Sequence, residues 1–369
     1  MQQEARERAA APGSARAAVA FQHALLAQQQ GKAQQAEALC TSVLEADPGH
    51  YGAWHMRGLL ALQGGRADEG IEWLERSLAL NPEQPAAHSN LGNAWLSRGD
   101  PQKALGSFER ALRLKPDYAV ALFNHGNALR ELGRREEALQ SYGAVLQLNG
   151  GHAPALNNRG LTLLELGRPA EALVAFERAV QLDPAFAEAE RNLAAALLKL
   201  ERPAEGLAVY DRLHTALPVD AEVWCGRGCA LLALGRFEDA RASFTRSLEL
   251  DPAHIDSLVN LGRALQLLHQ PAAALIDYER ALTRSPDTLR ALSDSGDALL
   301  ELDKPQEALA RYERALQLAP NDPDTLYKRG AVLHTLKRYE ASAQCYAEVL
   351  RIVPGHDYAQ GGLFHLWMD

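Results

Sequence analysis

The residues with the most regular chemical spacing in this 369-residue chain are asparagines. One constant interval separates Asn90, Asn124, Asn158 and Asn192 from one another in turn, and Asn260 lies two such intervals further on. A carboxamide both donates and accepts hydrogen bonds, which is what the main chain of an extended peptide requires. Because asparagine is a mediocre helix former, its repeated use within helical sequence needs an explanation. The row predicts a surface that binds peptide backbone without reading side chains.

The row has close neighbours and also interruptions. Asn93 and Asn127 each follow a member of the row by one helical turn. The same register holds Gln22, Met56, Gly226, Asp294 and Lys328 in place of asparagine. The predicted peptide-binding residues are Asn90, Asn124, Asn158, Asn192, Asn260, Asn93, Asn127 and Asp294. A polar face copied with a duplicated unit explains the same pattern without any ligand, and this alternative remains open.

The register comes from a repeat of about 34 residues that runs through nearly the whole chain. Prolines mark it at one or two repeat lengths from each other, at Pro48, Pro82, Pro116, Pro184, Pro218, Pro252, Pro286, Pro320 and Pro354. Ten units without insertion or deletion then occupy residues 17–356. Positions within a unit are counted from its first residue, so that Ala17 is position 1 of the first unit.

Small and aromatic residues recur at fixed positions and predict two helices in each unit. Position 8 is Gly or Ala, position 20 is Ala, Gly or Ser, and position 24 is aromatic in eight units. Small residues let two helices cross closely while a ring fills the space above them, so Gly160 and Ala172 are expected to touch. Gly at position 15 and Pro at position 17 suit a helix stop and the next helix start.

A helical wheel of the first helix separates two faces. Positions 4, 8 and 11 form the predicted core face, which includes Trp54, Trp95 and Trp224. Positions 2, 6, 9 and 13 lie on the opposite face, where the asparagines fall. The asparagine row is therefore expected on the exposed side of the first helix of each unit.

These patterns resemble the tetratricopeptide repeat over residues 17–356. The resemblance implies an all-α fold, a right-handed superhelix (an α-solenoid) of about ten helix-turn-helix repeats whose concave groove binds protein or peptide. Residues 1–16 are predicted to be a partly disordered N-terminal extension. Residues 357–369 are predicted to be a C-terminal capping or linker helix, which the end of a solenoid requires.

Other residues with chemical potential have plainer explanations. Cys225 and Cys229 lie one helical turn apart on the face expected to be exposed, but structural zinc needs four ligands. They are predicted to be small filler residues, and no metal site is predicted. Phosphate-loop, dinucleotide, zinc-protease and serine-hydrolase motifs do not occur, so no cofactor and no catalytic residue are predicted. Turn residues are the prediction for the histidines at position 34, which are His50, His152, His254 and His356.

Composition narrows the class of protein. The 38 Lys and Arg residues are outnumbered by 47 Asp and Glu residues, for a formal charge of −9, which argues against a nucleic-acid partner. Only four cysteines occur, as expected in a reducing compartment. No apolar run approaches the roughly 20 residues that span a bilayer. The sequence predicts a cytoplasmic protein with protein or peptide ligands and no membrane, and it allows a homodimer.

The last residues carry a second resemblance. Tyr358, Gly361, Leu363, His365 and Met368 match a Tyr-x-x-Gly-x-Leu-x-His-x-x-Met pattern. This stretch resembles the join between repeats and catalytic part in bacterial SPINDLY-like, O-linked N-acetylglucosamine transferase-like proteins. The resemblance implies the substrate-recognition arm of a protein O-glycosyltransferase, in a family whose eukaryotic members grip substrate main chain with an asparagine row. The alternative is a stand-alone scaffold that assembles a protein complex.

Overall fold

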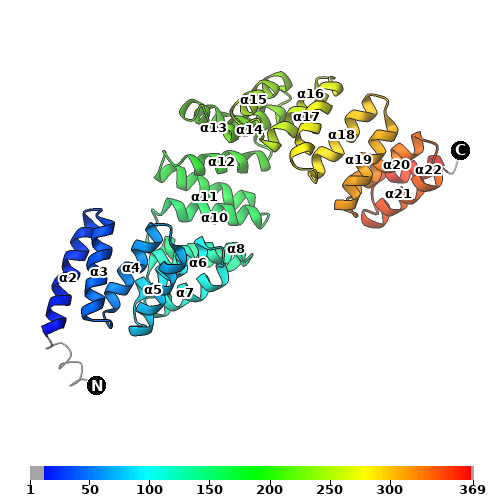
Figure 1. Cartoon of the computed structure of the whole chain (residues 1–369). Coiled ribbons are helices and arrows are strands. Elements are labelled where there is room, and N and C mark those ends of the chain that lie inside the picture. The colour runs from blue at the N-terminus through cyan, green and yellow to red at the C-terminus, as the bar shows by residue number, and fades with distance from the viewer. Residues whose placement is uncertain (1–11, 367–369) are drawn as a thin grey trace. The chain divides into compact units, whose positions relative to one another are not determined.

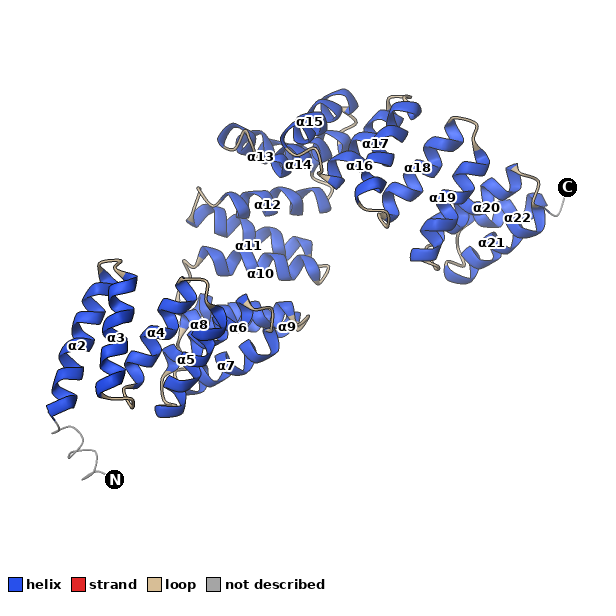
Figure 2. Ribbon diagram, viewed as in Figure 1, coloured by secondary structure: helices blue, strands red, loops and turns tan. Residues whose placement is uncertain are grey.

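The computed structural model describes residues 12–366, with side chains from residue 16 to residue 364. These residues form 21 α-helices joined by short turns, and no strand (Figure 1). Colouring by secondary structure shows the same succession of helices (Figure 2). The prediction of an all-α repeat fold is confirmed. Residues 1–11 of the predicted extension and residues 367–369 of the predicted C-terminal helix lie outside the described residues.

Each repeat supplies one helix A and one helix B. The helices A are α2 (Pro12–Gln29), α4 (Tyr51–Gln63), α6 (Pro85–Ser97), α8 (Ala119–Glu131), α10 (Ala153–Glu165), α12 (Ala187–Lys199), α14 (Ala221–Ala233), α16 (Ile255–Leu267), α18 (Leu289–Glu301) and α20 (Pro323–Thr335). The helices B are α3 (Ala33–Ala46), α5 (Ala67–Leu80), α7 (Pro101–Leu114), α9 (Arg135–Leu148), α11 (Pro169–Leu182), α13 (Pro203–Ala216), α15 (Phe237–Leu250), α17 (Pro271–Arg284), α19 (Pro305–Leu318) and α21 (Tyr339–Ile352). A final helix, α22 (Asp357–Leu366), comes after them.

The helices group into two compact units, divided between Phe186 and Ala187. The N-terminal unit contains the five repeats from α2 to α11, and the C-terminal unit contains the five repeats from α12 to α21 together with α22. None of the helices within residues 12–366 has the length and apolar character needed to cross a bilayer.

Position 15 closes the turn between helix A and helix B. Six glycines at this position have φ between 72° and 78°, which confirms the predicted left-handed helix stop. Four repeats adopt the same conformation without glycine, at φ of 57° to 60°. Those residues are Glu201, His269, Asp303 and Lys337.

Histidine at position 34 does more than form a turn. The Nδ1 atom of His50 accepts a hydrogen bond of 3.0 Å from the backbone N–H of Ala53, and the other three histidines make the same bond at 3.1 Å. This bond satisfies one of the unpaired N–H groups at the start of a helix A. The prediction of turn residues is confirmed, and their role as N-caps was not foreseen.

The two helices of a repeat meet at the glycine of position 8. A Cβ atom built on Gly160 would lie only 2.5 Å from the ring of Phe176. Ala172 beside this crossing is fully buried. Six further repeats with Gly at position 8 and a ring at position 24 make the same contact, which confirms the predicted small–aromatic packing. The absence of a side chain at position 8 therefore controls how closely helix A approaches helix B.

The predicted core face of helix A was partly wrong. Trp54 and Trp224 at position 4 are only partly buried, and each indole N–H donates a 3.0 Å hydrogen bond to the carbonyl of the proline six residues earlier. The adjacent position 3 is instead the buried one, with Ala53 and Val223 at 0% exposure. Large amphipathic rings lie at the edge of the core because their N–H group needs a polar partner.

The close approach at position 8 gives a matched pair of substitutions. Gly160→Ala should lower the free energy of unfolding by about 1–3 kcal/mol, because the added methyl group overlaps the Phe176 ring. Gly143→Ala in α9 meets nothing within 4 Å and should gain up to about 1 kcal/mol from helix propensity. Urea denaturation followed by circular dichroism measures both. Equal effects of the two substitutions would contradict the proposed packing.

Candidate functional site

Asparagines on three successive helices A of the N-terminal unit are joined by hydrogen bonds. Asn124 on α8 donates its side-chain amide to Asn93 Oδ1 on α6 at 2.8 Å. Asn158 on α10 donates in the same way to Asn127 Oδ1 on α8 at 2.9 Å. Position 6 of each of these repeats thus donates to position 9 of the preceding repeat. We call Asn90, Asn93, Asn124, Asn127 and Asn158 the amide face.

Asn127 is the centre of the amide face. Its Oδ1 also accepts a 2.8 Å hydrogen bond from the hydroxyl of Tyr142, and its Nδ2 lies 3.3 Å from Asn124 Oδ1. Burial raises the pKa of Tyr142 to about 12, so its hydroxyl remains a donor at neutral pH. The chain of contacts from Asn93 to Asn158 is therefore continuous, and the Asn127 oxygen is fully used.

The first residue of the row has a different partner. Asn90 Nδ2 lies 3.0 Å from Nε2 of His55 on α4. Burial lowers the pKa of His55, which keeps its ring neutral and lets Nε2 accept this bond. The amides were expected on an exposed face, available to a ligand. Those on α6, α8 and α10 instead already make some of their hydrogen bonds to side chains of neighbouring repeats. Asn93 keeps both of its amide N–H groups without a partner in the part of the chain that the structure describes.

The remaining predicted residues lie in the C-terminal unit, where position 6 of helix A has different partners. Asn192 on α12 is partly buried. Asn260 on α16 is only 6% exposed, and its amide lies 3.6 Å from Cys229 Sγ, again position 9 of the preceding repeat. The structure therefore does not present Asn260 on an open surface.

The contact between position 6 and position 9 of the preceding repeat is an ion pair near the C-terminal end. Lys328 at position 6 donates to Asp297 Oδ2 at 2.9 Å, where Asp297 is position 9 of the preceding repeat. Tyr312 donates to the other oxygen of Asp297 at 2.7 Å, as Tyr142 does to Asn127. Asp294 lies 3.6 Å from Arg290, and burial raises the pKa of its carboxyl. Here Lys replaces Asn at position 6 and Asp replaces Asn at position 9 of the preceding repeat. The contact between the two positions is therefore kept although position 6 is no longer asparagine.

The gap in the row at Gly226 has a steric cause. A Cβ atom on Gly226 would lie 2.3 Å from the ring of Tyr210 in the preceding repeat. Position 8 of that repeat is Ala194. The Tyr210 ring occupies the space of a position 6 side chain, as the Tyr346 ring does at Gly362 of α22. Sequence reasoning saw the gap but had no signal for the ring that fills it.

The cysteine pair is less exposed than predicted. Cys225 is only 6% exposed, which corrects its placement on the open face of α14. A side-chain hydrogen bond with Cys229 and burial both raise the pKa of Cys225, while the same bond lowers the pKa of Cys229. No cluster of three or more metal-ligating side chains occurs within the described residues.

These features define a class of all-α helical-repeat protein with a polar face on its helices A. Sequence profiles of the tetratricopeptide repeat match residues 21–85, 85–118, 119–152, 153–186, 221–254, 255–321 and 293–357. The chain belongs to the tetratricopeptide repeat family. It is accordingly a scaffold for protein–protein interaction, and the fold of its repeats is not a catalytic one. A search of curated proteins found no match.

Several solved structures are similar to the chain. Yeast Tom70 is 13% identical over 95% of this chain and 88% of its own, with a TM-score of 0.50, and shows the fold alone. TTC0263, a thermophilic TPR protein in Thermus thermophilus, is 26% identical over 49% of this chain and 98% of its own, with a TM-score of 0.45. YrrB, described as a TPR protein with an unusual peptide-binding site, is 26% identical over 50% of this chain and 95% of its own, with a TM-score of 0.42.

The contact at Gly226 can be tested by completing the row. Gly226→Asn should lower the free energy of unfolding by about 1–3 kcal/mol, because its side chain and the Tyr210 ring need the same space. Adding Tyr210→Ala should relieve that overlap, so the two changes together should cost less than the sum of their separate effects. Urea denaturation of the two single variants and the double variant measures the coupling. Strict additivity would show that Tyr210 does not occupy the gap.

Proposed function

We propose that the amide face of the N-terminal unit binds the main chain of an extended peptide. The observation that carries this proposal is the continuous set of amides on α6, α8 and α10, joined at 2.8–2.9 Å between helices. These bonds hold the side chains in fixed rotamers before any ligand arrives. A preorganised surface loses less conformational entropy on binding, so more of each new hydrogen bond contributes to affinity.

The hydrogen bonds already made determine what the amide face offers a ligand. The oxygen of Asn127 accepts two bonds, so it has no lone pair left. Asn93 keeps both N–H groups, and Asn124 uses only one of its two. The amide face therefore offers free N–H groups, concentrated at Asn93, together with free carboxamide oxygens, and the complementary groups are the carbonyls and N–H groups of a peptide main chain. Because these amides are uncharged, binding should depend only weakly on ionic strength.

The C-terminal unit supports this role less directly. Asn260 is nearly buried, and the link at Lys328 is ionic, so this part of the chain lacks a comparable run of amides. We therefore assign main-chain recognition to the amide face, and leave Asn192 and Asp294 as candidate contacts of a longer ligand. A ligand that reached Asp294 would meet carboxylates and respond to salt, unlike one held by the amide face alone.

Asn93→Asp separates ligand binding from the structural link. The carboxylate still accepts the bond from Asn124, but both N–H donors are lost and a negative charge faces the peptide carbonyls. Affinity for a short peptide selected from a random-sequence library should fall by about 1–3 kcal/mol, and the melting temperature should change little. Isothermal titration calorimetry and thermal denaturation measure the two quantities.

Asn149→Asp is the matched control. Asn149 is exposed in a turn outside the amide face, where its oxygen accepts from the N–H of Gly151, a bond the carboxylate also makes. This variant should bind the peptide as the wild type does. If Asn93→Asp also bound it with unchanged affinity, the amide face would have a structural role only.

A finer proposal is that the chain is the substrate-recognition arm of a protein O-glycosyltransferase. Tyr358, Gly361 and Leu363 of the matching tail pattern lie on α22, and the amide row is the second supporting feature. The backbone of His365 belongs to α22, whereas Met368 lies outside the described residues. The competing proposal is a stand-alone scaffold, for which the ten complete repeats are the supporting feature.

The intact mass of the protein from its native source distinguishes these two proposals. A species much heavier than the 40.2 kDa of this sequence, with binding of a sugar nucleotide, is expected of the glycosyltransferase arm. A mass equal to that of this sequence would contradict the arm and leave the scaffold. The test of peptide binding with Asn93→Asp does not depend on this outcome, because it uses only the amide face.

A further inference from the structure

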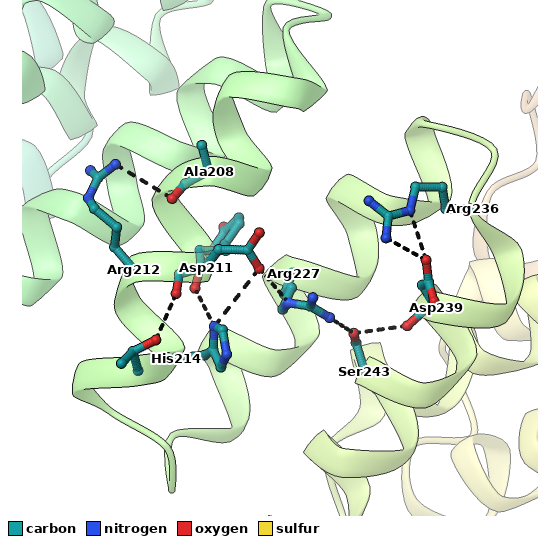
Figure 3. Close-up of polar contacts among 10 residues, drawn as sticks. Ala208, Asp211, Arg212, His214, Arg227, Arg236, Asp239 and Ser243 are labelled. Atoms are coloured by element: carbon teal, nitrogen blue, oxygen red, sulfur yellow. Dashed lines mark hydrogen bonds and ion pairs between the residues drawn. The ribbon is translucent and has the colours of Figure 1, made fainter.

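Position 7 of helix A lies between two helices B, and its side chain determines whether the space between them is filled. Arg227 of α14 fills this space (Figure 3). Its Nε donates to Asp211 of α13 at 2.8 Å, and its Nη1 donates to Ser243 of α15 at 2.7 Å. The guanidinium therefore joins the helix B of the preceding repeat to the helix B of its own repeat.

The third repeat leaves the corresponding space open. Its position 7 is Leu91, which is too short to join α5 to α7, and position 22 on α7 is Gly106. A Cβ atom on Gly106 would meet nothing within 4 Å. Leu91 and Gly106 line a cavity of about 510 Å³ between α5, α6 and α7, all within the N-terminal unit.

The charged side chains that line this cavity are mostly basic. Lys103, Arg110 and Arg113 of α7 are exposed and line it together with a single carboxylate, that of Glu75 on α5. The lining therefore has an excess of positive charge, in a chain whose formal charge is −9. We call this cavity the basic groove.

Arg110 at position 26 lacks the ionic partner that arginines have at this position in three other repeats. There the arginine lies 2.6–3.9 Å from a carboxylate at position 22, 23 or 29 of its own helix B. The pairs are Arg76 with Glu72, Arg280 with Asp277, and Arg246 with Glu249. In the third repeat these positions hold Gly106, Ser107 and Arg113. Among the residues that the structure describes, Arg110 makes no hydrogen bond or ion pair.

The other two cations are held only by exposed contacts. Lys103 Nζ lies 3.3 Å from Asp100 and 4.1 Å from the centre of the Trp95 ring. Arg113 lies 3.9 Å from Glu109. Exposed ion pairs of this kind contribute little to stability. Both cations can therefore turn toward a ligand at small cost.

The remaining titratable group of the basic groove is His88 on α6. Its Nε2 donates to the carbonyl of Pro82 at 2.8 Å. Burial lowers the pKa of His88, and the nearby charges of Arg110 and Arg113 lower it further. The ring is therefore neutral at neutral pH, and the positive charge of the groove comes from α7.

We infer that the basic groove binds a short acidic segment of a partner protein. One carboxylate of the segment pairs with Arg110 and takes the place of the missing partner within the repeat. A second pairs with Lys103, and an apolar side chain between them packs on Leu91 and Trp95. Charge complementarity selects this occupant. The surface shares no residue with the amide face.

The spacing of the cations sets the spacing of the carboxylates. Lys103 and Arg110 are about two helical turns apart, which is about 10 Å along α7. An extended segment covers this distance in about three residues. The segment therefore carries its two Glu or Asp residues about three positions apart.

Two labelled peptides test the chemistry of the ligand. One has two glutamates three positions apart with a leucine between them, and the other has glutamines in place of the glutamates. Fluorescence anisotropy with the full chain at low ionic strength should show the glutamate peptide binding at least about tenfold more tightly. Added salt should weaken this binding, because it screens exposed charges.

Charge reversal at one position in two repeats tests the location. Arg110→Glu should weaken the glutamate peptide at least about tenfold. Arg178→Glu is the matched control, because Arg178 is also exposed at position 26, in the fifth repeat, where position 19 is Glu171 instead of Lys103. The control makes the same change of charge in the N-terminal unit and should leave the affinity unchanged.

A substitution at Gly106 tests the role of the missing partner. Gly106→Glu places a carboxylate one helical turn before Arg110, as Glu72 precedes Arg76, and should weaken the glutamate peptide at least about tenfold. Gly106→Gln, of the same size, should retain binding. The Cβ atom has open space in both variants, so circular dichroism should show both folded as the wild type is.

Three results would overturn the inference. The first is equal affinity for the two peptides, or binding of neither. The second is an equal effect of Arg110→Glu and Arg178→Glu, which would reduce the contact to the overall charge of the unit. The third is a single-stranded oligonucleotide that binds more tightly than the glutamate peptide and is released by Arg110→Glu, since the basic groove would then recognise a phosphate backbone.

Discussion

The contact between a glycine at position 8 and an aromatic ring at position 24 is the constraint on which most of the repeats depend. In seven repeats a Cβ atom on that glycine would lie only 2.5–2.8 Å from a ring atom. The distance between helix A and helix B is therefore determined by a missing side chain and a large one. The first, second and sixth repeats lack this pair. In the sixth repeat position 8 is Ala194, and the Tyr210 ring packs on Gly226 of the next repeat, a contact that Tyr346 also makes with Gly362.

Contacts between repeats use a second rule, with position 6 donating to position 9 of the preceding repeat. The pair is Asn124 with Asn93 in one place and Lys328 with Asp297 in another. The same backbone register thus presents neutral amides on α6, α8 and α10 and a charged pair between α18 and α20. Only the neutral version leaves several polar N–H groups unused on a fixed surface, which is why main-chain recognition is assigned there. The amide face lies on helices A that are complete in their own repeats, so its chemistry is polar and directional.

The sequence by itself determined the period, the pairing of helices and the left-handed turns, because each depends on residue types at a fixed spacing along the chain. It also located the asparagine row. Only the tertiary structure decided that Asn124 and Asn158 are partly engaged by neighbouring helices, that Asn260 is buried, and that Tyr210 fills the gap at Gly226. These outcomes depend on which side chains of adjacent repeats meet in space. A helical wheel sorts the residues of a single helix by face and gives no information about neighbouring helices.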